Sequence, residues 1–152
     1  MSQRKKELGE RAEKRVKSIL VNSGYFVLHE SKIYPDFSLL SHSDKLSDVF
    51  PKEYAVEVKT TSGYNGSDKI GKFTVSREEF NSYEEISKYK DVVLILEIRP
   101  RGYNWRNYIY FVVPWINIHN RFIKTNPDQV TLSIWWTILN GHKLRDWLNF
   151  VC

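Results

Sequence analysis

Cysteine is nearly absent from the chain, whose only thiol is Cys152 at the last position. A single thiol forms no internal disulfide and supplies no thiolate cluster, which indicates a reducing compartment and disfavours zinc-finger chemistry. The histidines, His29, His42, His119 and His142, are scattered without an i, i+4 pair, so they do not favour a zinc site either. Any metal ion would therefore be bound by oxygen or imidazole ligands.

Long apolar runs are also missing. Stretches such as 92–96 are far shorter than the roughly 20 residues that cross a bilayer. The charged start, residues 3–7, lacks the apolar segment of a signal peptide. We therefore expect a cytoplasmic protein with no membrane partner. The sequence also contains neither a phosphate-binding Gly-Lys-Ser/Thr loop nor a serine nucleophile elbow.

What the chain does have is the composition of one basic domain. Its 152 residues are 41% hydrophobic and 14% aromatic, enough for one core, so we expect a single domain over 1–152. Lys and Arg outnumber Asp and Glu by 23 to 18, a modest excess that favours a polyanionic partner such as DNA. A solvated helix face explains the basic first helix equally well. The residues that we expect to contact DNA are Arg11, Lys14, Lys69, Lys72 and Arg101.

Hydrophobic periodicity predicts the elements of the first half. Apolar residues spaced by three and four predict an amphipathic helix over 5–22, which Gly24 ends. Strands are expected at 25–28, 35–40 and 54–60, the second entered through Pro35. A flexible, glycine-rich loop is expected at 61–72.

The second half begins with a clear helix signal. Ser76 and Glu79 form the pattern of a capping box, which predicts a helix to about Lys88. Strands follow at 91–98 and 108–113, the first nearly continuous in apolar residues and hence buried on both faces. The remaining expectations are a helix at 114–122, a strand at 130–137 and a helix at 143–150. Trp135, Trp136 and Trp147 would anchor this last segment in the core, or form a base-stacking or dimer surface.

This order of elements predicts an α/β domain in which helices flank a mixed central β-sheet. Within it, Asp36 and Glu57 fall on consecutive strands whose pairing would bring their carboxylates together. Two adjacent carboxylates favour a hard divalent cation, Mg²⁺ or Mn²⁺. Lys59 is two residues beyond Glu57 and therefore lies on the same face of its strand. An ammonium group there would position water and stabilise charge during phosphodiester hydrolysis.

A plainer interpretation of these residues also exists. A Glu-x-Lys triplet occurs by chance in most proteins, as an ordinary ion pair on a surface strand. The triplet gains weight from the preceding Pro35-Asp36, from the helix before it and from the surrounding strands.

Together, Pro35-Asp36 and Glu57-Val58-Lys59 resemble the PD-(D/E)xK nuclease superfamily, which includes restriction endonucleases and archaeal Holliday-junction resolvases. The resemblance covers about residues 8–113 and leaves 114–152 as a C-terminal extension. It implies a restriction-endonuclease-like core, with Asp36 and Glu57 as metal ligands and Lys59 as a catalytic residue.

The resemblance also implies a third acidic residue at the site. Gly9-Glu10-Arg11-Ala12-Glu13, followed by Gly24-Tyr25, looks like the start of a resolvase domain, whose helical glutamate joins the metal site. Glu13 matches that glutamate by position and borders the apolar stripe beside Val16 and Leu20, whereas Glu10 lies nearly opposite Ala12. We therefore assign Glu13 to the metal and catalytic set.

A second similarity points away from a dedicated resolvase. Residues 57–61 and 73–80 look like the nuclease-like domain at the C-terminus of the protein NO VEIN and in prokaryotic defence proteins. The connection between Asp36 and Glu57 is also longer than in compact resolvases.

The resulting hypothesis is that the protein is an Mg²⁺-dependent deoxyribonuclease. If it resembles the resolvases in function too, we expect a homodimer that acts on DNA junctions. The alternative is a catalytically silent module that keeps the fold and binds DNA.

Overall fold

The computed structural model describes residues 3–23, 26–29, 37–40, 53–62, 72–100 and 108–151. Its helices are α1 (Gln3–Asn22), α2 (Arg77–Ile86), α3 (Trp115–Ile118), α4 (Ile134–Asn140) and α5 (Leu144–Val151). Its strands are β1 (Phe26–His29), β2 (Phe37–Leu40), β3 (Glu53–Ser62), β4 (Lys72–Ser76), β5 (Asp91–Arg99), β6 (Ile109–Pro114), β7 (Ile123–Asn126), β8 (Gln129–Ser133) and β9 (His142–Lys143).

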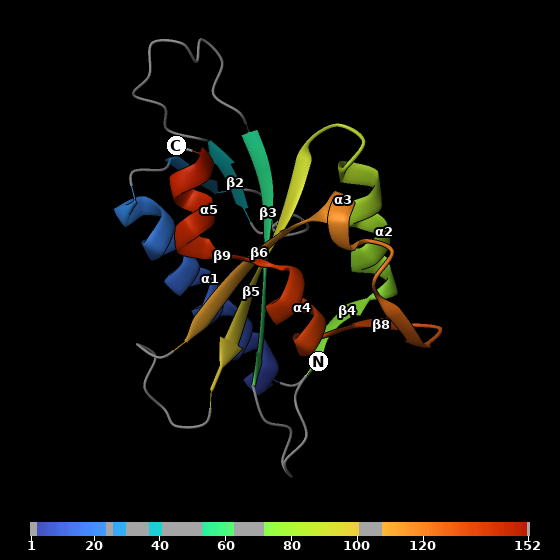
Figure 1. The fold of residues 1–152 in the computed structure, drawn as a ribbon. Coiled ribbons are helices and arrows are strands. Elements are labelled where there is room, and N and C mark those ends of the chain that lie inside the picture. Colours follow the sequence, from blue (N-terminus) through green and yellow to red (C-terminus); the bar gives the residue numbers. More distant parts are fainter. Residues whose placement is uncertain are drawn as a thin grey trace.

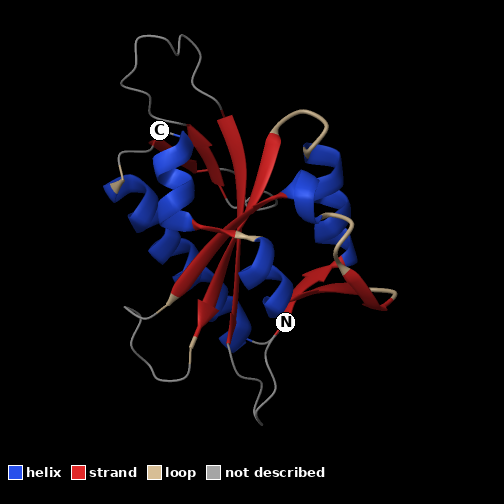
Figure 2. Cartoon of the chain, viewed as in Figure 1, coloured by secondary structure: helices blue, strands red, loops and turns tan. Residues whose placement is uncertain are grey.

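A six-stranded mixed sheet forms the centre of the fold (Figure 1). Its strand order is β1-β2-β3-β5-β6-β9, with β3 and β5 parallel and the other neighbours antiparallel. Residues 92–98 of β5 are all buried, because this strand lies inside the sheet and both of its faces are covered. The predicted α/β domain with a mixed sheet flanked by helices is confirmed (Figure 2).

Different elements cover the two faces of this sheet. On one face, α1 and α5 bury Val16 and Trp147 against Val56. On the other, α2, α3 and a small three-stranded sheet of order β4-β8-β7 bury side chains such as Tyr83 and Leu132. Successive residues of a strand point to opposite faces, so β3 divides its side chains between the two cores. We call these the α1 face and the α2 face.

Most predicted elements of the first 113 residues are confirmed, with shifted ends. The exception is β4, because the segment expected to be a loop ends in a strand that starts at Lys72. Residues 63–71 of that expected loop lie outside the described residues.

The C-terminal segment departs further from the prediction. The strand expected at 130–137 ends at Ser133, whose hydroxyl accepts a hydrogen bond from the Trp136 backbone and begins α4. The helix expected at 114–122 is limited to Trp115–Ile118. Trp147 packs edge-on against Tyr54 with 5.4 Å between ring centroids, which anchors α5 to the α1 face. No helix in the described ranges is long and apolar enough to span a membrane.

Candidate functional site

Glu57 is a carboxylate buried inside the sheet, on the α2 face. Only 1% of its surface is exposed, and its partner on the parallel neighbour β5 is Leu94. A buried carboxylate requires hydrogen-bond donors to offset its lost hydration. The Tyr83 hydroxyl of α2 supplies one, donating to Glu57 Oε2 at 2.7 Å.

Lys59 lies on the same face as Glu57, as the two-residue period of a strand predicts. Its ammonium group forms an ion pair with Glu79 of α2. The Tyr83 hydroxyl also lies 2.9 Å from Glu79 Oε2. Because a hydroxyl carries one proton, Tyr83 is shared between two carboxylates. We call Glu57, Lys59, Glu79 and Tyr83 the β3–α2 cluster.

The first turn of α2 explains why Glu79 and Tyr83 face β3. Ser76 caps the helix by accepting a hydrogen bond from the Glu79 backbone at 3.1 Å, as the capping box predicts. Residues four apart lie on one face of a helix, so Glu79 and Tyr83 point the same way. The Glu79 side chain, expected only to complete the cap, reaches Lys59.

Charge within the β3–α2 cluster is balanced locally. Burial alone would raise the pKa of Glu79, but its ion pair and hydrogen bond with Lys59, together with the Tyr83 and Ser76 hydroxyls, outweigh burial and lower that pKa. Burial and the neighbouring Glu57 carboxylate raise the pKa of Tyr83 far above its usual value. Tyr83 therefore stays protonated and remains a hydrogen-bond donor.

We predict that Tyr83→Phe lowers the free energy of unfolding by about 1.5–3 kcal/mol, the usual contribution of a hydrogen bond to a charged group. The variant keeps the ring, which packs against Trp115, and removes only the hydroxyl that solvates Glu57. Urea denaturation measures the change. Tyr89→Phe is the matched control, since Tyr89 is 80% exposed and its variant should unfold like the wild type. Equal midpoints for the two variants would contradict the assigned role.

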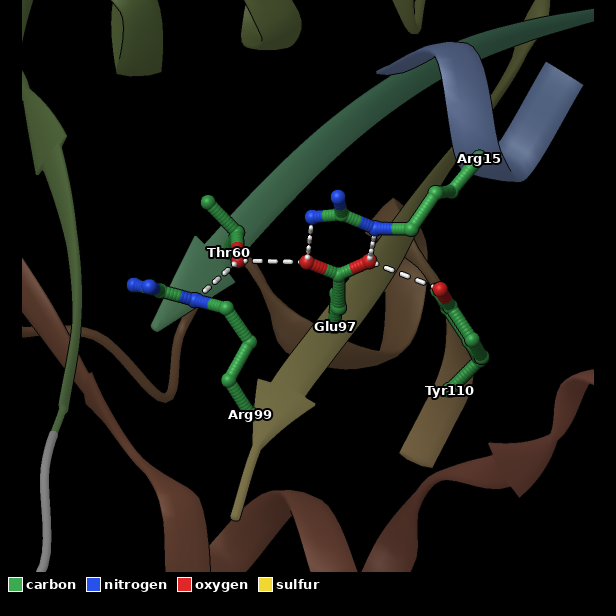
Figure 3. Close-up of polar contacts among 5 residues, drawn as sticks. All are labelled: Arg15, Thr60, Glu97, Arg99 and Tyr110. Atoms are coloured by element: carbon green, nitrogen blue, oxygen red, sulfur yellow. Dashed lines mark hydrogen bonds and ion pairs between the residues drawn. The ribbon is translucent and has the colours of Figure 1, made fainter. Parts of the chain in front are cut away.

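A second buried carboxylate, Glu97 of β5, occupies the α1 face and is fully buried (Figure 3). Arg15 of α1 binds it with two hydrogen bonds, Nε to Oε2 at 2.9 Å and Nη2 to Oε1 at 2.8 Å. The hydroxyls of Thr60 and Tyr110 each donate at 2.7 Å. The Thr60 hydroxyl in turn accepts from Arg99 Nε at 3.0 Å. Glu97 thereby ties α1 to three strands of the sheet.

This environment predicts a pH dependence of stability. Burial alone would raise the pKa of Glu97, but hydrogen bonds from Arg15, Tyr110 and Thr60 outweigh burial and hold it below 4.5. At pH values between the pKa of Glu97 in the folded protein and 4.5, the unfolded chain binds more protons than the folded protein does. The contribution of Glu97 to the free energy of unfolding is therefore present above pH 4.5 and is lost as the pH falls through its pKa in the folded protein. We expect the difference in free energy of unfolding between the wild type and Glu97→Gln to shrink as the pH falls from 6 to 3. Urea titrations of both proteins across this pH range measure that difference. A constant difference would contradict it.

Of the predicted catalytic residues, the structure brings Glu57 and Lys59 together on one face of β3. Asp36 lies outside the described residues; its neighbour Phe37 pairs with Val56, the residue before Glu57. Glu13 is half-buried on α1, whose core stripe packs on the face opposite the β3–α2 cluster. No group of three or more His, Cys, Asp or Glu side chains gathers among the described residues.

The predicted DNA-contacting residues are only partly described. Arg11 and Lys14 are exposed on α1, and Lys72 is exposed at the start of β4. Lys69 and Arg101 lie outside the described ranges.

Sequence reasoning missed several residues of the two polar networks, among them Glu97, Glu79, Tyr83 and Arg15. Glu97 is the one charged residue within the apolar run 92–98, and that interruption could have indicated a buried, paired carboxylate. Glu79 and Tyr83 are four residues apart on a well-signposted helix, which could have placed them on one face. Arg15 gave no signal beyond its place beside the apolar stripe.

Comparison with known structures establishes the class of fold. The chain is similar to the 1.6 Å structure of Hjc, a Holliday junction resolvase from the archaeal hyperthermophile Archaeoglobus fulgidus, with a TM-score of 0.58 and 14% sequence identity. The match covers 93% of this chain and 95% of that chain. No protein-family model and no curated protein sequence matches the chain. The similarity confirms the predicted fold, which this chain shares with the resolvase.

Proposed function

We propose that this chain is a divalent-metal-dependent nuclease that hydrolyses phosphodiester bonds of DNA. The observation that carries the proposal is the buried Glu57 beside Lys59 on one face of a central strand, in a chain with the fold of a Holliday junction resolvase. Glu57 is buried and Lys59 is partly buried, and removing two charged groups from water costs free energy that apolar residues at these positions would not cost. If the chain acts as resolvases do, its substrate is branched DNA such as a four-way junction.

The available donors fit Mg²⁺ or Mn²⁺. Glu57 offers carboxylate oxygen, the ligand type that these hard cations prefer, and the Tyr83 hydroxyl orients that carboxylate as an outer hydrogen-bond partner would. We assign Asp36 and Glu57 as ligands. For Glu13 to assist them, its side chain must reach past the edge of the sheet, because α1 packs on the face opposite Glu57. When bound, the metal ion lowers the pKa of a water molecule and neutralises charge on the scissile phosphate.

Lys59 positions the attacking water and stabilises the negative charge that develops on the phosphate. Glu79 holds the Lys59 side chain through their ion pair, which limits the rotamers of a long, flexible group. Arg11, Lys14, Lys69, Lys72 and Arg101 contact the DNA backbone and position it.

The second candidate function is a catalytically silent module that binds DNA. One observation favours it: Lys59 and Glu57 already have protein partners in Glu79 and Tyr83, so a structural role can retain them without catalysis. Such a module would bind DNA in a salt-sensitive way and release no product.

The experiment that tests the proposal is incubation of the purified protein with linear duplex, single-stranded and four-way-junction DNA, in Mg²⁺, in Mn²⁺ and in EDTA. Products that appear with metal and not with EDTA support the nuclease, and the substrate that is cut shows the shape it acts on. Binding without cleavage in every condition supports the silent module. Sedimentation velocity then tests the homodimer that a junction resolvase requires.

A further inference from the structure

A groove of about 660 Å³ opens on the α1 face, on the side of the sheet opposite the β3–α2 cluster. It runs between the C-terminal half of α1 and the start of β6. Its volume lies within the range of ligand-binding pockets in proteins. The side chains that line it and enter the argument are Lys14, Arg15, Ser18, Asn22, Tyr108 and Tyr110.

Two tyrosines and an arginine give this groove a rigid aromatic and cationic surface. The Arg15 guanidinium lies 5.0 Å from the centre of the Tyr108 ring, and Tyr110 donates to Glu97. Two nitrogens of Arg15 bind Glu97, while the third, Nη1, points away from that carboxylate (Figure 3). Glu97 therefore fixes both Arg15 and Tyr110, so a ligand would meet groups that lose little conformational entropy on binding.

The charge of the groove favours an anion. None of its described lining residues is acidic; the charge of Arg15 is paired with Glu97, so the net positive charge comes from Lys14, which is exposed at the rim. Arg11 is exposed one helical turn before Arg15, on the same side of α1, and extends the positive surface. Cations that flank aromatic rings are the combination with which proteins bind nucleic-acid strands.

We propose that this groove binds a single-stranded segment of DNA, with a base stacked on Tyr108 and the adjoining phosphate held by Lys14 and Arg15 Nη1. Duplex DNA keeps its base faces stacked inside the helix, so only unpaired nucleotides can present a face to these rings. The inference rests on the proposed function in taking DNA as the substrate. It adds that the protein holds an unpaired strand on the face of the sheet opposite Glu57 and Lys59.

The test measures binding in EDTA, where cleavage is prevented, with a fluorescein-labelled oligothymidine and a labelled duplex of equal length. Tyr108→Ala should weaken oligothymidine binding about tenfold, the usual effect of losing one base-stacking contact, and leave duplex binding nearly unchanged. Lys14→Ala should weaken binding of both probes and reduce the salt dependence. The matched controls, Tyr89→Ala and Lys88→Ala, remove an exposed tyrosine and an exposed lysine outside the groove and should bind like wild type.

Two further measurements guard against misfolded variants. Tyr108→Phe keeps the ring and should retain oligothymidine affinity. Ultraviolet irradiation of the wild-type protein with oligothymidine containing 5-iododeoxyuridine should crosslink the peptide that contains Tyr108. Equal oligothymidine affinity for Tyr108→Ala and Tyr89→Ala, crosslinking confined to other peptides, or a wild type that binds no oligothymidine would each overturn the proposal.

Failure of the groove and failure of the nuclease are distinguishable. If the wild type binds oligothymidine through Tyr108 but cleaves no DNA in Mg²⁺ or Mn²⁺, the proposed strand-binding groove is supported and the proposed nuclease activity is contradicted. If the wild type cleaves DNA but Tyr108→Ala binds oligothymidine as tightly as the wild type does, the nuclease activity is supported and the strand-binding groove is contradicted.

Discussion

Lys59→Ala is expected to lower metal-dependent cleavage of DNA by about 100- to 1000-fold, the usual cost of removing a group that stabilises transition-state charge. The loss should fall on kcat, because Lys59 acts on the reacting phosphate and the exposed basic residues of α1 supply most of the binding. Single-turnover cleavage in Mg²⁺, on whichever DNA the wild type cuts, measures it. DNA affinity in EDTA should change little.

Two controls make this result interpretable. Lys59→Ala also leaves the Glu79 carboxylate without its ion-pair partner, so a urea titration must show that the variant is folded under assay conditions. Lys88→Ala removes a lysine whose partner is an exposed glutamate and should cleave at the wild-type rate. Asp36→Asn, which changes no residue of the β3–α2 cluster, should also abolish cleavage and preserve DNA binding. Undiminished cleavage by Lys59→Ala or by Asp36→Asn would contradict the assignment of these residues to the catalytic site.

The fold of the first 113 residues could be predicted because its signals are local. The apolar period of α1, the Ser76 cap of α2 and the apolar run of β5 each depend on neighbouring residues. The parallel pairing of β3 with β5 follows from the helix that connects them.

The C-terminal segment was less predictable because tertiary contacts decide its structure. Residues 130–137 are apolar enough for one strand, yet Ser133 ends β8 by capping α4. Nothing local distinguishes the two outcomes, since Ile134 is buried in a helix as readily as in a strand.

At the site, the two-residue period of β3 was sufficient to place Glu57 and Lys59 on one face. Their partners were not predictable, because Glu79 and Tyr83 come from α2 and meet β3 only through the packing of helix on sheet. The same holds for Arg15 and Glu97, which are 82 residues apart in the chain. Periodicity predicts which face a residue occupies, and packing between elements determines what it meets there.

Arg15→Met is expected to lower the free energy of unfolding at pH 7 by about 3–5 kcal/mol, because it leaves the Glu97 carboxylate buried without its cation. Methionine preserves much of the aliphatic packing of the arginine, so the lost ion pair dominates. Thr60 and Tyr110 still donate to Glu97, but neutral hydroxyls do not balance its charge. Urea denaturation of the variant at pH 7 measures the loss.

The pH dependence and the double variant separate this cause from lost packing. We expect that without Arg15 the burial of Glu97 outweighs its hydrogen bonds from Tyr110 and Thr60 and raises its pKa above the unfolded value. The penalty is then full above the raised pKa and disappears as pH falls toward the unfolded value. The destabilisation of Arg15→Met should therefore be smaller at pH 5 than at pH 7. Glu97→Gln added to Arg15→Met removes the unbalanced charge and should recover part of the stability, so the double variant should be destabilised by clearly less than the sum of the two single effects. Additive effects that do not vary with pH would instead assign the loss to the contact of the Arg15 guanidinium with the Tyr108 ring, and Glu97 would then contribute no more than its hydrogen bonds.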